Sequence, residues 1–251
     1  MDLPFANEVK NELIAAKLLM KESLHPWGSR ILTHFSDVED DLHWDMLPAV
    51  TAVVHRSLGL SFRHTVSMTA IFSMLYLSNY IHDAVVDEEE GQEHDRELQF
   101  SILIGDYIFG AELKLLSEID SHYLLPVFAE LMCEISEDQV RRKIRGDSET
   151  DLEMLVRGKT SLYRTAFLVA AVSAGISERE RALYREMGHN LGMAVSLIAR
   201  GHSNNSVYPY LEKAKALRLL TGGERCRDKH LLDMLLEGLA VDTTNCKVAV
   251  V

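Results

Sequence analysis

The chain has 251 residues, of which 47% are hydrophobic and 25% charged, enough apolar material for one sizeable core in a globular protein. Its formal net charge of −12 excludes sequence-independent nucleic-acid binding and peripheral binding to acidic lipid through basic residues, because both depend on Lys and Arg that neutralise phosphates. Only 5 Pro and 14 Gly are present, and apolar residues recur at intervals of three and four, so the sequence predicts an all-α protein in a single domain, residues 1–251.

The cysteines indicate a reducing compartment. Cys133, Cys226 and Cys246 are odd in number and share no metal-ligand spacing. The first ten residues contain no basic segment followed by an apolar one, and no apolar run reaches the length that spans a membrane. We therefore expect a cytoplasmic protein without a transmembrane segment.

The N-terminal half is predicted to consist of helices with short breaks. The predicted helices cover residues 7–24, 43–58 and 62–82. Residues 30–35 form a segment too short to assign, and the acidic tract 37–42 is expected to be a turn leading into the next helix. The helix over 62–82 is long, apolar and Met-rich, which is typical of a central core element because it has little polar face to offer water.

An acidic cluster follows this core helix. If the helix continues through Glu90, then Asp83, Asp87 and Glu90 share one face, and two carboxylates one turn apart suit a hard cation such as Mg²⁺. The alternative is a helix that simply ends in a solvated acidic segment. The C-terminal end of a helix is electrostatically unfavourable for carboxylates, so helix stability does not explain their position.

The C-terminal half is also predicted to be helical. The predicted helices cover residues 97–119 (interrupted at Gly105), 122–144, 151–175, 177–200, 210–220 and 228–239. Residues 145–151 are the clearest surface loop, in which Ser148 or Thr150 is expected to cap the following helix. Ser177 is expected to be an N-cap with Glu180 at the capping-box position, and residues 241–251 to be a frayed tail.

Four segments carry a family resemblance. In chain order they are I-H-D-A-V-V-D-E (81–88), I-L-I-G-D-Y-I-F-G-A (102–111), G-K-T-S-L-Y (158–163) and M-G-H-N-L-G-M-A-V-S-L-I (187–198). They resemble the first aspartate-rich motif, the G-D-Y helix, the K-T motif and the helix before the second aspartate-rich motif of trans-type polyprenyl diphosphate synthases. The resemblance spans about residues 57–239, leaving residues 1–56 as divergent N-terminal helices. It implies an isoprenoid-synthase-like helical bundle that joins isopentenyl diphosphate to an allylic diphosphate.

The resemblance also implies site residues. Ionising an allylic diphosphate leaves a carbocation and pyrophosphate, so such a site holds Mg²⁺ between acidic helices and adds basic donors. Asp83 and Asp87 match the metal ligands, and Lys159 and Thr160 match the diphosphate-binding residues. From its residue type alone, Lys159 fits a helix-end cation equally well, and His82 is either a metal contact or, more commonly, a hydrogen-bonded structural residue.

Several positions depart from the family pattern. Ala84 replaces a carboxylate of the first motif, and residues 199–205 contain no acid where the second motif is expected. Residues 41–50 stand where the family has the basic G-K-R-L-R-P segment, yet they contain neither Lys nor Arg. Tyr76 stands where the family often has a histidine, and acidic residues at 88–90 replace the basic pair that follows the first motif. We therefore expect no complete set of catalytic residues and at most weak Mg²⁺ binding.

This combination is similar to the small component of two-component heptaprenyl or hexaprenyl diphosphate synthases. The segments H-P-W (25–27), L-L-S-E-I (115–119) and K-I-R (143–145) also match that component. The resemblance implies a non-catalytic or weakly active subunit that forms a heterodimer with a catalytic polyprenyl diphosphate synthase subunit, or a homodimer alone, in the synthesis of quinone (menaquinone) side chains. One alternative is a self-sufficient Mg²⁺-dependent prenyltransferase with an unorthodox second metal-binding motif. The other is an isoprenoid-binding or interaction protein.

Two segments are predicted to contact the partner. Residues 68–77 are rich in Met and Leu, and residues 166–174 are mostly small, so together they offer more apolar surface than one bundle needs to enclose. The Met-rich segment 68–74 is also compatible with core filling or with a prenyl tunnel. Gln139 and the arginines at 141–142 match no motif and are expected on the surface.

Overall fold

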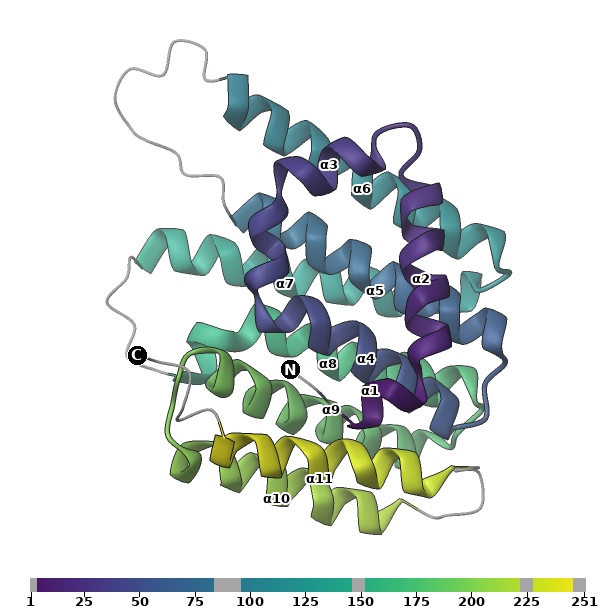
Figure 1. Ribbon diagram of the computed structural model, residues 1–251, viewed down its shortest axis with the longest axis vertical. Helices are drawn as coiled ribbons and strands as arrows, with labels where there is room; N and C mark the ends of the chain where they lie inside the picture. The colour runs from purple at the N-terminus through teal and green to yellow at the C-terminus, as the bar shows by residue number, and fades with distance from the viewer. Residues whose placement is uncertain (1–3, 84–95, 146–151, 222–227, 246–251) are drawn as a thin grey trace.

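The computed structural model describes residues 4–83, 96–145, 152–221 and 228–245, and within these ranges it contains helices and no strand (Figure 1). The all-α prediction is therefore confirmed. The helices are α1 (Pro4–Glu8), α2 (Lys10–Ser23), α3 (Gly28–His34), the 3₁₀ helix η1 (Ser36–Asp40), α4 (Leu42–Ser57), α5 (Phe62–Asp83), α6 (Arg96–Glu118), the 3₁₀ helix η2 (His122–Leu124), α7 (Leu125–Arg145), α8 (Leu152–Ser173), α9 (Glu178–Ala199), α10 (Asn204–Leu220) and α11 (Lys229–Asn245).

Helix α5 is the central element of the bundle. Every residue from Thr65 to Asn79 is buried, with α2, α4 and α6 packed around the helix. The hydroxyl of Ser73 donates to the carbonyl of Thr69, so this buried polar group is satisfied within the helix. The prediction of a core helix is confirmed.

The predicted partner-contacting segments are wrong, because the chain covers both of them itself. Met68, Met74 and Leu77 are fully buried in α5, and Ala166 and Ala170 are fully buried in α8. Helix α8 packs against α7 and α9, so its small residues serve packing within the bundle. Exposed apolar side chains occur instead on α6, as described below.

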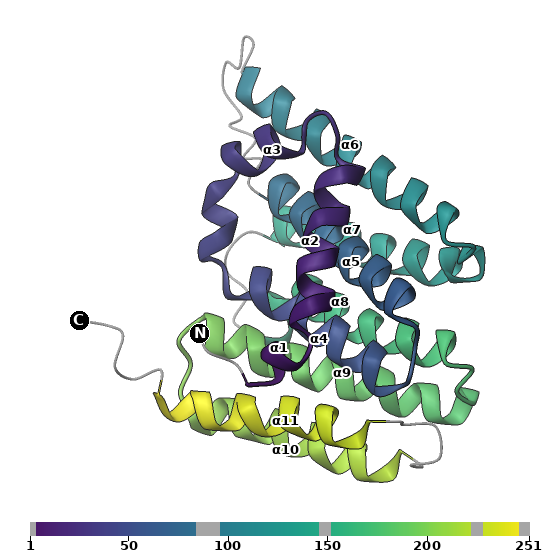
Figure 2. The same cartoon turned by 45° about the vertical axis from the view of Figure 1, so that its right-hand side comes forward.

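Helices α8 and α9 approach each other closely because two glycines of α9 face α8. A Cβ atom at Gly188 would lie 2.6 Å from the carbonyl oxygen of Tyr163, and one at Gly192 would lie 3.0 Å from the Tyr163 Cβ. The distance at Gly188 is shorter than real Cβ contacts, so a side chain there would force the backbones apart, whereas a Cβ at Gly192 would make a tight contact to which its neighbours must adjust. Figures 1 and 2 show α10 and α11 together at the lower end of the bundle, and α9 packs against both α8 and α10.

Some helix boundaries differ from the predictions. Helix α6 continues across Gly105, where an interruption was predicted. A Cβ at Gly105 would lie 2.4 Å from the His82 ring, so the glycine leaves the space that this ring occupies. Helix α10 begins at Asn204, before the predicted start at 210, and contains Pro209. Helix α11 extends to Asn245, past the predicted end at 239.

Other boundaries follow the sequence signals. Ser177 caps α9, since its hydroxyl oxygen accepts the backbone N–H of Glu180 and its O–H donates to the Glu180 carboxylate, as the capping box predicts. The predicted caps Ser148 and Thr150 lie outside the described residues. None of the helices in the described ranges combines the length and apolarity needed to cross a lipid bilayer.

Candidate functional site

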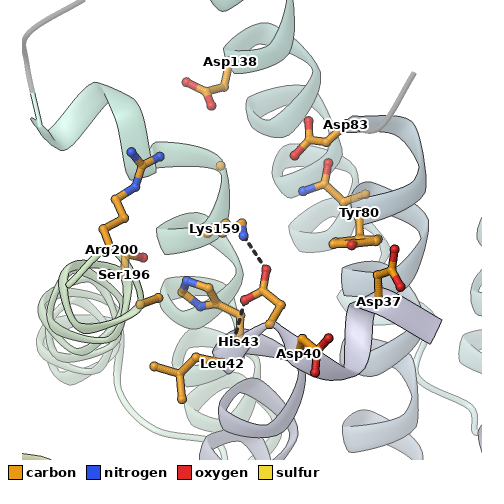
Figure 3. A pocket seen from close by; sticks show the side chains of 14 residues that line it. Asp37, Asp40, Leu42, His43, Tyr80, Asp83, Asp138, Lys159, Ser196 and Arg200 are labelled. Carbon is orange, nitrogen blue, oxygen red and sulfur yellow. Dashed lines mark hydrogen bonds and ion pairs between the residues drawn. The ribbon is translucent and has the colours of Figure 1, made fainter. Parts of the chain in front are cut away.

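A cavity of about 520 Å³ opens where the segment before α4 faces the C-terminal ends of α5 and α9 and the first half of α8 (Figure 3). A volume of this size falls within the range of small-molecule sites. Its lining comes from six segments of the chain: Asp37, Asp40, Asp41, Leu42, His43, Asn79, Tyr80, Asp83, Asp138, Gly158, Lys159, Ser196, Ala199 and Arg200.

Asp41 receives three hydrogen bonds at this cavity. It is the N-cap of α4, and its Oδ1 accepts the backbone N–H of His43 at 3.0 Å. Its Oδ2 accepts from Lys159 Nζ at 2.8 Å and from the Tyr76 hydroxyl at 2.6 Å. Burial raises the pKa of Asp41, but the hydrogen bonds from Lys159, Tyr76 and His43 outweigh it and hold the pKa below the usual range. The side chain is therefore a carboxylate at neutral pH.

Lys159 lies in the cavity as predicted, but its charge is engaged by the protein. Besides the ion pair with Asp41, its Nζ lies 5.6 Å from the centre of the Tyr76 ring, which is cation–π geometry. Lys159 is in the first half of α8, so the alternative that it is a cation stabilised at the C-terminal end of a helix does not apply. An incoming anion competes with Asp41 for this ammonium group.

The buried floor of the cavity is neutral. His43 Nδ1 and the Tyr163 hydroxyl share a hydrogen bond of 2.9 Å. Burial, together with the positive charge of Lys159, lowers the pKa of His43 to about 3. Burial also raises the pKa of Tyr163 well above its usual value. Neither ring adds charge to the site at neutral pH.

Asp83 lies at the end of α5, as the first aspartate-rich motif predicts. Its Oδ1 accepts from Gln139 Nε2 at 2.9 Å, and the same amide nitrogen donates to Asn79 Oδ1 at 2.9 Å. Gln139, which was expected on the surface, is half-buried and links α7 to the end of α5. Asp87 lies in residues 84–95, outside the described part of the chain.

Thr160, predicted to bind diphosphate beside Lys159, does not line the cavity. Its side chain is buried between α8 and α9, with Oγ1 3.7 Å from the Met193 sulfur. The geometry thus gives no support for a substrate contact at Thr160.

The lining carries more negative than positive side chains. Among the described residues it includes five aspartates and two cations, Lys159 and Arg200. Asp138, from α7, and Asp41 were not identified from the sequence, because no motif marks them. Figure 3 shows Asp83 across the cavity from Arg200, with Asp138 on another helix at the top of the view.

The matching family model is that of the polyprenyl synthetases, and it matches residues 45–198. The chain belongs to the polyprenyl synthetase family. Over 199 residues it is 24% identical to the octaprenyl diphosphate synthase of Haemophilus influenzae, covering 75% of this chain and 59% of that protein. It is 29% identical over 187 residues to the all-trans-nonaprenyl-diphosphate synthase (geranyl-diphosphate specific) of Rhodobacter capsulatus, covering 70% and 55%. The chain thus spans somewhat over half the length of these curated relatives.

Solved structures of polyprenyl synthetases share the fold. The Caulobacter crescentus polyprenyl synthase, complexed with calcium and isoprenyl diphosphate, superposes with a TM-score of 0.74 at 18% identity, covering 95% of this chain and 97% of that one. The geranyl diphosphate synthase small subunit of Antirrhinum majus has a TM-score of 0.66 at 14% identity, covering 93% and 98%. A deletion mutant of the mint heterotetrameric geranyl pyrophosphate synthase has a TM-score of 0.68 at 14% identity, covering 93% of this chain and 99% of that one. The predicted isoprenoid-synthase-like bundle is confirmed.

Polyprenyl synthetase chemistry implies Mg²⁺ held between two acidic helices. The described residues do not fit such a site. No group of three or more His, Cys, Asp or Glu side chains is placed to hold a metal within the ranges that the structure describes. The wall formed by the end of α9 contributes Ser196, Ala199 and Arg200, none of which is a carboxylate. We therefore derive no chemical step through a metal at this cavity.

Proposed function

We propose that this polyprenyl synthetase-family chain is a non-catalytic or weakly active subunit of a long-chain polyprenyl diphosphate synthase. In this proposal it supports the synthesis of quinone side chains by pairing with a catalytic subunit. The cytoplasmic location expected from its cysteines remains a prediction.

The ion pair between Asp41 and Lys159 carries the proposal. A prenyl diphosphate synthase needs cations that are available to bind diphosphate and stabilise the departing pyrophosphate. Here the ammonium group that matches the K-T motif already contacts a carboxylate at 2.8 Å. The neighbouring Asp37 and Asp40 add further negative charge to the same cavity, which disfavours an incoming polyanion.

The end of α9 supports the same conclusion. The second aspartate-rich motif would follow this helix, but the cavity lining there consists of Ser196, Ala199 and Arg200. A Mg²⁺–diphosphate complex requires oxygen ligands from the protein, and this wall contributes no carboxylate. The two features together support the proposal that the chain alone has reduced or absent catalytic activity.

A surface on α6 supports the pairing. Phe100, Ile102, Leu103 and Leu113 are exposed on this helix, and Leu103 is 66% exposed. An exposed apolar group of this kind is typical of an interface. Two structures with the same fold are described as a small subunit and as a heterotetrameric synthase, so assemblies of more than one kind of subunit are known for this fold.

The test is a comparison of two preparations. The chain is purified alone and after co-expression with a complete polyprenyl diphosphate synthase subunit, and each is assayed with farnesyl diphosphate, isopentenyl diphosphate and Mg²⁺. We expect no detectable product from the chain alone, and a change in the rate or product length of the co-expressed subunit. Steady turnover by the pure chain supports the self-sufficient enzyme instead, and no effect on any partner supports the isoprenoid-binding or interaction protein.

A further inference from the structure

The outer face of helix α2 is basic and apolar, although the protein as a whole is acidic. All five residues at positions i, i+4, i+7, i+8 and i+11 of this helix are exposed: Lys10, Ile14, Lys17, Leu18 and Lys21. In an α-helix these positions fall within an arc of about 100°, so the five side chains form one stripe, the α2 face. Figure 2 shows α2 on the near side of the bundle, where a partner can reach this face.

The lysines of the α2 face are unpaired. None of the three has a hydrogen bond or ion pair with any residue that the structure describes. By contrast, Lys114 and Lys215 each pair with a glutamate of their own helix. Two like charges at i and i+4, as at Lys17 and Lys21, weaken a helix, so the stability of α2 does not explain this arrangement.

A hollow of about 140 Å³ adjoins the α2 face on the side of α4. Lys17 lies on its lining, and its apolar walls are Leu13, Met20, Trp44 and Pro48. A cavity of about 150 Å³ accommodates a benzene ring, so this hollow has room for one apolar side chain of a partner. Fully desolvated pockets of this kind hold the side chains that contribute most to a protein interface.

We propose that the α2 face binds an acidic amphipathic helix of a partner protein. Ile14 and Leu18 contact the apolar stripe of that helix, as apolar residues one turn apart do when one helix packs against another. The lysines pair with Asp or Glu residues that flank the stripe, and such flanking charges select the partner. The proposal goes beyond the proposed function, because the α2 face shares no residue with the exposed apolar surface of α6.

The charge of the surroundings favours a protein helix over an acidic lipid surface. Glu8 and Glu22 are exposed at the two ends of the α2 face, and Asp45 is exposed at the edge of the hollow. A bilayer is extended, so it faces these acids together with the lysines, in a chain whose net charge is −12. A single helix covers only the stripe, and acids more than about 8 Å away from it are largely screened at physiological salt.

The probe is a labelled helical peptide of the same length as α2, with a leucine stripe, one phenylalanine and glutamates on both flanks. Its twin has lysine in place of every glutamate. Fluorescence anisotropy at low salt should show that the acidic peptide binds about tenfold more tightly than its twin, and added salt should reduce this difference. Replacing the phenylalanine of the acidic peptide with alanine should weaken binding about tenfold, because the hollow then remains unfilled.

Charge reversal on α2 tests the role of the lysines. In Lys17→Glu the affinity for the acidic peptide should fall about tenfold, and the triple variant Lys10→Glu, Lys17→Glu, Lys21→Glu should prefer the lysine twin. Lys213→Glu, at an exposed residue of α10, is the matched control and should leave binding unchanged. Because all four lysines are exposed, circular dichroism and thermal melts should show folded variants.

Four results would overturn the proposal. They are no measurable binding of the acidic peptide, equal affinity for the two peptides, an unchanged preference in the triple variant, and binding to phosphatidylglycerol vesicles that the acidic peptide does not displace. The last result would make the α2 face a lipid-binding surface. The assay contains neither a diphosphate nor a second synthase subunit, and Leu103→Lys on α6 should leave it unchanged, so its outcome is independent of the test of the proposed function.

Discussion

Asp41 and Lys159 are 118 positions apart in the sequence, and their side chains form an ion pair of 2.8 Å. The contact joins the N-cap of α4 to the first half of α8 across the mouth of the cavity. Because the two side chains are only 18% and 36% exposed, water screens the pair less than it would an ion pair on the open surface.

Releasing Lys159 should create an anion site. In Asp41→Asn the side chain still caps α4, but it no longer carries the charge that pairs with Lys159. We expect the affinity for inorganic pyrophosphate, measured by calorimetry, to rise about tenfold, which is the effect of one charge-assisted hydrogen bond. Asp45→Asn, at an exposed residue outside the cavity lining, is the control that should change nothing. Equal affinities in wild type and Asp41→Asn would contradict the prediction.

Asp83 should contribute to any residual binding of a metal–diphosphate complex. Calorimetry with an allylic diphosphate and Mg²⁺ should show weak heat that diminishes in Asp83→Ala, because carboxylate oxygens are the ligands that Mg²⁺ prefers. Asp45→Ala controls for the general loss of negative charge. If Asp83→Ala leaves the signal unchanged, the acidic cluster is only a solvated helix end.

His55 should make the protein sensitive to mild acid. It is fully buried, and burial together with the charge of nearby His64 lowers its pKa to about 3. The folded pKa lies below the unfolded value of about 6.5, so stability is fully present above about pH 6.5 and is lost as the pH falls toward the folded pKa. Between about pH 7.5 and about pH 5 this one residue should cost about 2 kcal/mol of unfolding free energy.

The comparison with His55→Gln isolates this effect. Glu112 titrates in the opposite sense: its folded pKa is raised, so its contribution is present below its unfolded pKa and is lost as the pH rises through the folded value. Urea unfolding at both pH values should therefore be read as the difference between wild type and variant. That difference should shrink by about 2 kcal/mol at the lower pH, and a constant difference would refute the role of His55.

Gly188→Ala should destabilise the contact between α8 and α9. The added Cβ would lie 2.6 Å from a backbone carbonyl oxygen, which cannot move without shifting the helix. We expect a loss of about 1–3 kcal/mol in urea unfolding. The matched control is Gly110→Ala, where a Cβ meets nothing within 4 Å and the better helix propensity of alanine should stabilise the protein by up to about 1 kcal/mol. Equal stabilities of the two variants would show that the contact tolerates a side chain.

Leu103→Lys should disrupt pairing with a catalytic subunit. Leu103 is 66% exposed on α6, so a lysine there leaves the fold intact but places a charge within an apolar surface. We expect the variant to lose co-purification with a co-expressed synthase and to lose its effect on prenyl synthesis, while its melting temperature stays unchanged. Leu219→Lys, on α10 and 85% exposed, is the control. Normal pairing of Leu103→Lys would place the interface elsewhere.

The sequence predicted the elements that depend on local pattern. Long helices with recurring apolar residues were recognised, and two residues of the quoted motifs, Asp83 and Lys159, line the same cavity, while their roles as metal and diphosphate ligands stay predictions. The capping signal at Ser177 also held, because it involves residues only three positions apart.

Long-range relationships were not predictable in this way. The carboxylate that pairs with Lys159 comes from a segment that was interpreted as an acidic turn without basic residues, and nothing local marks Asp41 as the partner of Lys159. The contacts of Gln139 with α5 depend on helix packing in the same way. A helix that is apolar on all sides indicates burial, yet periodicity does not say whether this chain or a partner covers it, which explains the incorrect interface over residues 68–77.

The glycine-mediated contact between α8 and α9 also determines how the cavity can change its width. Lys159 and Ser196 are carried by two helices whose backbones already touch, so these two residues keep a fixed spacing. Asp41 belongs to the segment between η1 and α4, which is the opposite side of the mouth. Moving that segment outward would separate Asp41 from Lys159. The same movement would therefore widen the entrance of the cavity and expose the Lys159 ammonium group to an anion.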